Sequence, residues 1–365
     1  MFDIKERLTN CLCKPRPVLE RNETPPIALQ NDFDPQYYLA TYPDVTASGI
    51  DPFEHWTKFG RMEGRSGSPN HPAPFKLKKL LKYGVSYADN IQMLPPVGTP
   101  SELSDNRSTI DWWNGAQQGC WSEEPDWEDL IKRDIAQLPD DGNCENYSGQ
   151  DHFGYWLYGY LDYYRTLSAV EPYGIHSGRY YDFGGSTGRV FRHFAFQSDK
   201  WDVWSSDFKI SSAEWNLRYF PPSIKVFLNS SAPSLPLPDN YFDLITAYSV
   251  FTHINETETT WLLELRRILK VGGVAYISIH DEATWLDMVE PLRDSVVKYR
   301  PDIATLAEMP KGKTVVTFCE DDPYNCHIFH CHEYIKNVWG RYFEICEIKS
   351  KYHFKQAVVV CRRTD

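Results

Sequence analysis

The chain has 365 residues and a formal net charge of −12, which is enough length for one large domain and a smaller one. A negative field of this size repels phosphate backbones, so we expect no nucleic-acid partner. No stretch reaches the roughly 20 apolar residues of a membrane helix, and the N-terminus lacks a signal-peptide core. The expected location is the cytoplasm. The nine cysteines are scattered and odd in number, which argues against a disulfide framework.

The first 70 residues divide into a tail and a compact unit. Residues 1–30 contain several prolines that break any long helix, and they are expected to form a tail. Residues 31–70 predict a small helical module. In this module Asp34-Pro35 and Asp51-Pro52 each place an N-cap before a proline at the first helical position.

The pattern changes near residue 146. Residues 71–145 are interpreted as a linker and cap region with a helix at Trp127–Leu138. Residues 146–365 begin with a helix near 153–169 and continue as alternating strands and helices. This alternation is typical of an α/β fold with a parallel sheet.

A glycine-rich turn lies near the start of this α/β region. A short apolar strand in YYDFGGSTGR (residues 180–189) leads into Gly184, Gly185 and Gly188, and a helical run follows. Such a turn lets the backbone approach a nucleotide closely and points free helix N–H groups at it. The same pattern is also compatible with a tight turn that binds nothing.

An acidic residue ends the next strand. The strand Trp201–Ser206 leads into Asp207, and a carboxylate at this position can accept hydrogen bonds from both hydroxyls of a ribose. Asp207 could instead cap a helix. However, Ser211 and Glu214 predict a capping box for the helix that follows, which leaves Asp207 for a ligand.

Polar residues also follow the strand Leu244–Ala247, at the edge where open α/β sheets bind ligands. The sequence YSVFTH places Ser249 and His253 there. Asn255 and Glu258 predict a capping box for the next helix.

The last strands complete the pattern. Val274–Ile279 is an apolar strand that leads directly into His280 and Asp281. Phe343–Lys349 and Ala357–Cys361 are predicted strands, close enough in sequence to pair antiparallel.

Five sequence elements occur in this order: DFGGSTGR, Asp207, LPLPDNYFDLI, SVFTH and ELRRILKVGG. Through these elements the sequence resembles the class I S-adenosylmethionine-dependent methyltransferases over about residues 150–365. The resemblance implies a Rossmann-like sheet, mostly parallel with an antiparallel last strand, and S-adenosylmethionine as the cofactor. A nicotinamide dehydrogenase would instead need G-x-G-x-x-G, which is absent here.

The resemblance also implies a set of cofactor contacts. Asp182, Gly184 and Gly188 would lie against the methionine part, and the same turn contributes Gly185 and Ser186. Asp207 would hold the ribose, Asn229 and Ser230 would lie by the adenine, and Ser249 would flank the sulfonium. This chain departs from the family pattern at Ser186, where a glycine is usual, and at Asn229, where an acid is usual.

Methyl transfer to a hydroxyl requires in-line alignment of the reacting atoms and a base near the hydroxyl proton. The candidates are His253, after the fourth strand of the region, and His280 with Asp281, after the fifth. For His253, the alternative is a helix-entry residue bonded to backbone.

A second cluster of metal-ligating residue types lies further along the chain. It comprises Cys319, Cys326, His327, His330, Cys331 and His332. The spacing lacks two matched C-x-x-C or H-x-x-x-H pairs, so we expect no metal site. In our interpretation His332 lies near the start of a helix, and the cysteines are small buried apolar residues.

The module at 31–70 carries FDPQYYLATYPDV and DPFEHW. It resembles a short helical repeat that accompanies bacterial glycosyltransferases and other enzymes of surface polysaccharide assembly. This association favours O-methylation of a sugar in a polysaccharide or its precursor, with a glycosyltransferase complex as a partner. Two alternatives stay open. One is a methyltransferase for a small metabolite or a lipid head group, and the other is a catalytically silent scaffold with the same fold.

Overall fold

The protein was analysed as a computed structural model, which describes residues 33–60, 65–68, 96–104, 121, 125–140, 151–318 and 325–365. The predicted tail at 1–30 and Cys319 lie outside the described residues. Within the described part, no helix combines the length and the apolar character needed to cross a bilayer.

The centre of the fold is a seven-stranded sheet with the spatial order β10-β11-β7-β6-β3-β4-β5. Its strands are β3 Gly178–Phe183, β4 Trp201–Asp207, β5 Lys225–Leu228, β6 Phe242–Ala247, β7 Leu269–Ile279, β10 Glu344–His353 and β11 Gln356–Arg362. Neighbouring strands from β5 to β7 pair parallel, whereas β11 pairs antiparallel with both β7 and β10. The predicted mostly parallel α/β sheet and its antiparallel terminal pair are therefore confirmed.

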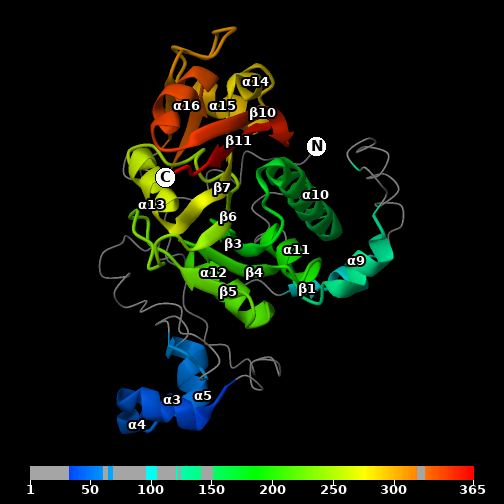
Figure 1. Cartoon of the computed structure of the whole chain (residues 1–365), viewed down its shortest axis with the longest axis vertical. Coiled ribbons are helices and arrows are strands. Elements are labelled where there is room, and N and C mark those ends of the chain that lie inside the picture. The colour runs from blue at the N-terminus through cyan, green and yellow to red at the C-terminus, as the bar shows by residue number, and fades with distance from the viewer. Residues whose placement is uncertain are drawn as a thin grey trace.

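Helices cover both faces of this sheet (Figure 1). The helices are α10 His152–Val170, α11 Phe191–Phe196, α12 Ile210–Tyr219 and α13 Glu258–Ile268. Alternate side chains along each strand enter different cores. Tyr180 of β3 belongs to the core with Trp156, Phe191 and Trp215, whereas Tyr181 belongs to the core with Trp261 and the C-terminal helix residues.

A separate set of elements is inserted between β7 and β10. It comprises α14 Glu282–Leu286, α15 Glu290–Tyr299, β8 Lys313–Thr317, β9 Cys326–His330 and α16 His332–Val338. Figure 1 shows its helices grouped at the end of the molecule beside β10 and β11. The strands β8 and β9 pair antiparallel. Residues 326–330, for which the sequence predicts no strand, form β9. His332 opens α16 as predicted, and Cys326 and Cys331 are buried as predicted.

The N-terminal helices form their own small core. They are α3 Pro35–Thr41, α4 Pro43–Ser48 and α5 Pro52–His55, and Tyr38, Val45 and Trp56 are buried between them. Asp34 accepts hydrogen bonds from Gln36 N and Tyr37 N, and Asp51 accepts one from Glu54 N. Both predicted N-caps are therefore confirmed.

The segment before α10 is anchored to the α/β domain by a buried ion pair. Its elements are β1 Pro96–Gly98, α7 Pro100–Leu103, α9 Trp127–Arg133 and β2 Leu138–Pro139. The helix predicted at Trp127–Leu138 ends earlier, because Asp134 turns inward. Its carboxylate accepts hydrogen bonds from the Arg192 guanidinium at 2.7 and 3.1 Å and from Trp156 Nε1 at 2.8 Å. The side chains of Asp134 and Arg192 are completely buried.

Removal of the Asp134 carboxylate should destabilise the fold. Asp134→Ala leaves Arg192 as an uncompensated buried charge, so we expect the free energy of unfolding to fall by about 3–5 kcal/mol. Urea denaturation measures this value. The matched control is Asp129→Ala on the same segment. Its ion pair with Arg133 is half exposed, and its loss should cost below about 1 kcal/mol. Equal effects of the two substitutions would contradict the anchoring role of Asp134.

Candidate functional site

The sheet has a switch point between β3 and β6. The chain runs outward from β3 to β4 and β5 and then returns to β6 on the other side of β3. At such a point the connections leave toward opposite faces and open a crevice at the carboxyl ends of the strands. The glycine turn, Asp207, Ser249 and His280 all lie at this edge. The turn and His280 directly follow β3 and β7, Asp207 is the last residue of β4, and Ser249 lies two residues after β6.

The glycine turn has a conformation that requires glycine. Gly184 and Gly188 have φ of +74° and +89°. A Cβ at Gly184 would lie 2.5 Å from Val250 Cγ2, and one at Gly188 would lie 2.4 Å from the Phe220 ring. The amides of Gly184 and Gly185 both donate to Ser206 O, at 2.9 and 3.0 Å. The predicted free N–H groups are therefore absent at these two positions. The glycines serve close packing against β4 and the loop after β6.

Asp207 holds the turn to the end of β4. Its carboxylate is 4% exposed and accepts hydrogen bonds from Ser186 N at 3.0 Å and Lys209 N at 2.8 Å. The predicted capping box at Ser211 and Glu214 is wrong, because α12 begins at Ile210 without a side-chain cap. The carboxylate thus lies beside the turn and orients it.

Asp182 lies beneath the same turn. Its side chain is 2% exposed and accepts a hydrogen bond from Thr246 Oγ1 of β6 at 2.6 Å. Burial raises the pKa of this carboxyl to about 7, although the Thr246 hydrogen bond and the Arg189 charge act in the opposite direction. A cation that approached this carboxylate would favour its ionised form.

Asn229 follows β5 next to Asp207. Its backbone N donates to Asp207 O at 3.0 Å, and its Nδ2 donates to Ser230 O at 2.8 Å. Its Oδ1 is buried and has no hydrogen-bond partner among the described residues. A buried amide oxygen without a partner is a fitting acceptor for an amino group of a ligand. The adenine end of the expected cofactor offers such a group, so the residues present fit it.

A chain of hydrogen bonds joins β6, β7 and β11 at this edge. Ser249, with φ of +56°, receives a hydrogen bond at Oγ from Gln356 Nε2 at 3.0 Å. Gln356 Oε1 accepts one from Ser278 Oγ at 2.7 Å. Gln356 Nε2 also lies 3.5 Å from Nε2 of His280. Sequence reasoning missed Gln356, whose only signal is a polar side chain at the start of an apolar strand.

A family model described as "Methyltransferase domain" matches residues 181–277, from β3 to β7. Residues 181–277 therefore form a methyltransferase domain, and the protein is an S-adenosylmethionine-dependent methyltransferase. Its strand order and the residues of its glycine turn agree with this assignment, and its cofactor is S-adenosylmethionine.

Among solved structures, the methyltransferase is similar to a putative S-adenosylmethionine-dependent methyltransferase from Methanococcus maripaludis. The identity is 19% and the TM-score 0.39, over 62% of this chain and 94% of the other. It is also similar to the 1,6-didemethyltoxoflavin-N1-methyltransferase of Burkholderia thailandensis, with 11% identity and a TM-score of 0.39 over 74% and 93% of the two chains. No curated protein matches the chain.

The two candidate bases of the methyltransferase differ in their surroundings. His280 is 7% exposed, and its Nδ1 has no hydrogen-bond partner among the described residues. Burial, followed by the charges of His327 and His253, lowers its pKa well below the usual value. His253 is half-buried, and its Nδ1 lies 2.7 Å from Cys326 O. This contact agrees with the alternative role given above, a residue whose side chain bonds to the backbone.

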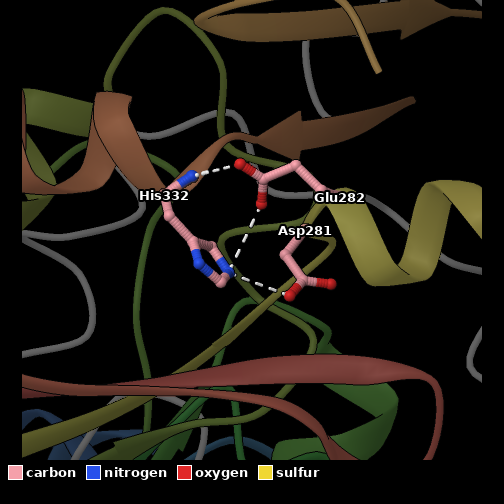
Figure 2. Close-up of side chains that lie close together, drawn as sticks. All are labelled: Asp281, Glu282 and His332. Atoms are coloured by element: carbon pink, nitrogen blue, oxygen red, sulfur yellow. Dashed lines mark hydrogen bonds and ion pairs between the residues drawn. The ribbon is translucent and has the colours of Figure 1, made fainter. Parts of the chain in front are cut away.

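Asp281 occupies a different environment from His280. It caps α14 by accepting from Thr284 N at 2.9 Å, and it also accepts from Ser350 Oγ at 2.5 Å. Figure 2 shows the imidazole of His332 beside the carboxylates of Asp281 and Glu282, at 3.0 and 3.3 Å from Nε2. Because both oxygens of Asp281 are already engaged, the geometry argues against this residue as the base.

The same three side chains could hold a metal ion, since their ligand atoms lie within 4.8 Å of one another. They also form a complete ion-pair cluster without one. The Asp281 hydrogen bond raises the pKa of His332, which favours an imidazolium that pairs with the two acids. We therefore interpret this cluster as a clamp between α14 and α16.

The raised pKa of Asp182 predicts pH-dependent cofactor binding. Below about pH 7 the carboxyl is mostly protonated before binding. If the cationic methionine part contacts this carboxyl, as the resemblance implies, its binding must displace that proton. The affinity for S-adenosylhomocysteine should then fall by up to about tenfold for each pH unit below 7. Above pH 7 the affinity should not change with pH. Calorimetry in two buffers with different ionisation heats measures both the affinity and the released proton.

Asp182→Asn is the matched control, because the amide retains an acceptor for Thr246 and cannot titrate. The affinity of this variant for S-adenosylhomocysteine should not depend on pH between 5.5 and 8, because residue 182 can no longer titrate. If the unmodified protein bound with equal affinity and without proton release over that range, contact between Asp182 and the cationic part of the cofactor would be excluded.

Proposed function

We propose that this methyltransferase methylates a hydroxyl group of a sugar in a cell-surface polysaccharide or its precursor, in the cytoplasm. The observation that carries the reaction class is the chain Ser249–Gln356–His280. It connects the residue expected beside the sulfonium with a neutral imidazole. A hydroxyl that lies between them would have a methyl donor on one side and a base on the other.

In this proposal three groups of residues at the carboxyl edge of the sheet each bind one part of the cofactor. The turn from Gly184 to Gly188 and the Asp182 carboxylate bind the methionine part. Asp207 binds the ribose hydroxyls, and Asn229 with Ser230 binds the adenine. The cofactor supplies an electrophilic methyl group on a positively charged sulfur.

The chain itself then has two tasks in the reaction. It must hold the acceptor oxygen in line with the methyl carbon, and it must take up the hydroxyl proton. Proximity and alignment of this kind can lower the activation free energy by about 7–11 kcal/mol. The acceptor hydroxyl would give its proton to an imidazole nitrogen of His280, while the cofactor would supply the methyl group. A neutral imidazole is the form that can accept it.

The choice of a sugar rests on the N-terminal module, whose sequence resembles units found with polysaccharide enzymes. Its helices form a separate core around Tyr38 and Trp56, which suits a docking unit for a glycosyltransferase. A small metabolite or a lipid head group is the alternative acceptor.

Acceptor screening tests this proposal. The protein is incubated with S-adenosylmethionine that carries a radioactive methyl group, together with oligosaccharides, phenols, amines or phospholipids. We expect label in the oligosaccharide fraction. Label only in phenols, amines or phospholipids would overturn the sugar proposal. A protein that gave no heat of binding with S-adenosylhomocysteine and labelled nothing would be a scaffold.

The assignment of the base predicts a specific kinetic change. His280→Ala should lower kcat by about 10²-fold or more and leave the Kd for S-adenosylhomocysteine within about twofold. His176→Ala is the matched control, since His176 is an exposed loop residue and its replacement should change neither constant. A wild-type kcat in His280→Ala, with a large loss in His253→Ala, would move the base to His253.

A further inference from the structure

A third imidazole joins the two candidate bases. His327 of β9 lies with its ring centroid 5.7 Å from that of His253 and 6.1 Å from that of His280. The backbone fixes this arrangement, because Ile328 N donates to Thr252 O at 2.9 Å and His330 N donates to His280 O at 2.8 Å. The inserted hairpin is thus bonded to the loop after β6 and to the end of β7.

Two of these imidazoles have unused polar atoms. Nδ1 of His280 and Nδ1 of His327 are both buried and make no hydrogen bond of normal geometry with the described residues, although the Ile328 backbone lies close enough to the His280 ring to act on its pKa. Buried polar atoms are nearly always paired, and an unpaired one costs about 1–3 kcal/mol. Two such atoms on adjacent rings point to a ligand that brings hydrogen-bonding groups.

The charge of the site limits the class of that ligand. Burial, followed by the nearby His253, lowers the pKa of His327 to about 4, and the pKa of His280 is also far below neutral. Both rings are therefore uncharged at pH 7. Phosphates and carboxylates are usually bound by cations, and amines by carboxylates, whereas a neutral imidazole can donate to or accept from a hydroxyl.

Aromatic rings continue outward from His327. The Phe318 ring lies 5.0 Å from that of His327, and the Tyr299 ring lies 6.0 Å from that of Phe318, between centroids. Phe318 is half-buried and Tyr299 is 37% exposed. Such rings offer flat apolar faces with a polar end at Tyr299, which fits a ring-shaped ligand with one apolar face and hydroxyls at its edge.

We propose that His327, Phe318 and Tyr299 form an acceptor subsite that binds a polyhydroxylated ring and directs one of its hydroxyls to His280. The subsite rests on the proposed function, since it names the acceptor class of the same reaction. Metal binding is a weaker explanation of the three imidazoles. Among the described residues, the ligand atoms that gather closely enough for an ion are those of Asp281, Glu282 and His332 instead.

Binding of simple glycosides tests this subsite directly. The protein is saturated with S-adenosylhomocysteine and titrated with methyl glycosides of glucose, mannose and galactose, while the imidazole nitrogen signals are followed by NMR. We expect at least one glycoside to shift the signals of His280 and His327 and to leave that of His176 unchanged. If none of the three shifts the His280 and His327 signals, at concentrations that would saturate a millimolar complex, the subsite is excluded.

Substitutions then separate the subsite from the reaction. His327→Ala and Phe318→Ala should each raise the KM or Kd for the glycoside at least tenfold and leave the Kd for S-adenosylhomocysteine unchanged, which also reports correct folding. His327→Gln, which restores a hydrogen-bonding group, should recover part of the loss. A glycoside methylated with wild-type KM by both alanine variants would overturn the subsite and leave the proposed function intact. A protein that transferred methyl groups only to non-sugar acceptors would overturn both.

Discussion

The hydrogen bond from Thr246 to Asp182 crosses the switch point of the sheet, and the arrangement of the site depends on it. Strands β3 and β6 meet there, and helices leave them toward opposite faces. Tyr180 donates or accepts at the same Thr246 hydroxyl at 2.7 Å, so three buried polar groups satisfy one another below the turn. Because the glycine turn begins one residue after β3, this polar bridge fixes the height at which the turn lies over the sheet.

Residues outside the matched family segment support the same turn from above. Asp162 of α10 pairs with Arg189, which follows Gly188, at 2.5 Å, and with His353 of β10 at 3.0 Å. All three side chains are buried. Despite its burial, the interactions with His353 and with the Arg189 guanidinium hold the pKa of Asp162 at about 2. A carboxylate of this kind stabilises the fold above its unfolded pKa near 4, and this contribution is lost as the pH falls toward 2. The helix α10 and the turn between β10 and β11 are therefore fixed to the glycine turn as one unit.

The sequence predicts the strands and the glycine turn well, because their signals are local. The period of the apolar residues and the positive φ of Gly184 and Gly188 depend on near neighbours only. The capping box predicted at Asn255 and Glu258 fails for the opposite reason. Glu258 accepts hydrogen bonds from Tyr334 and Trp339 and pairs with Lys313, all of which are far away in the chain, so it is unavailable to cap α13, whose N-cap is Thr257. The position of His327 beside His280 is likewise set by a pairing between distant segments, which no local spacing encodes.

The antiparallel direction of β11 explains why the proposed acceptor side of the site depends on residues near the end of the sheet's last strand pair. A parallel strand at this position would place its last residue at the carboxyl edge of β7. Because β11 runs the other way and Ala357 pairs with Ile279, its first residue, Gln356, lies level with His280 and can reach both His280 and Ser249. The β8–β9 hairpin reaches the same edge from the insertion. The proposed cofactor side is thus built by β3, β4 and β5, which the sequence motifs identify. The proposed acceptor side is built by residues 280–356, where the reversed strand and the insertion bring His280, His327 and Gln356 together without a shared motif.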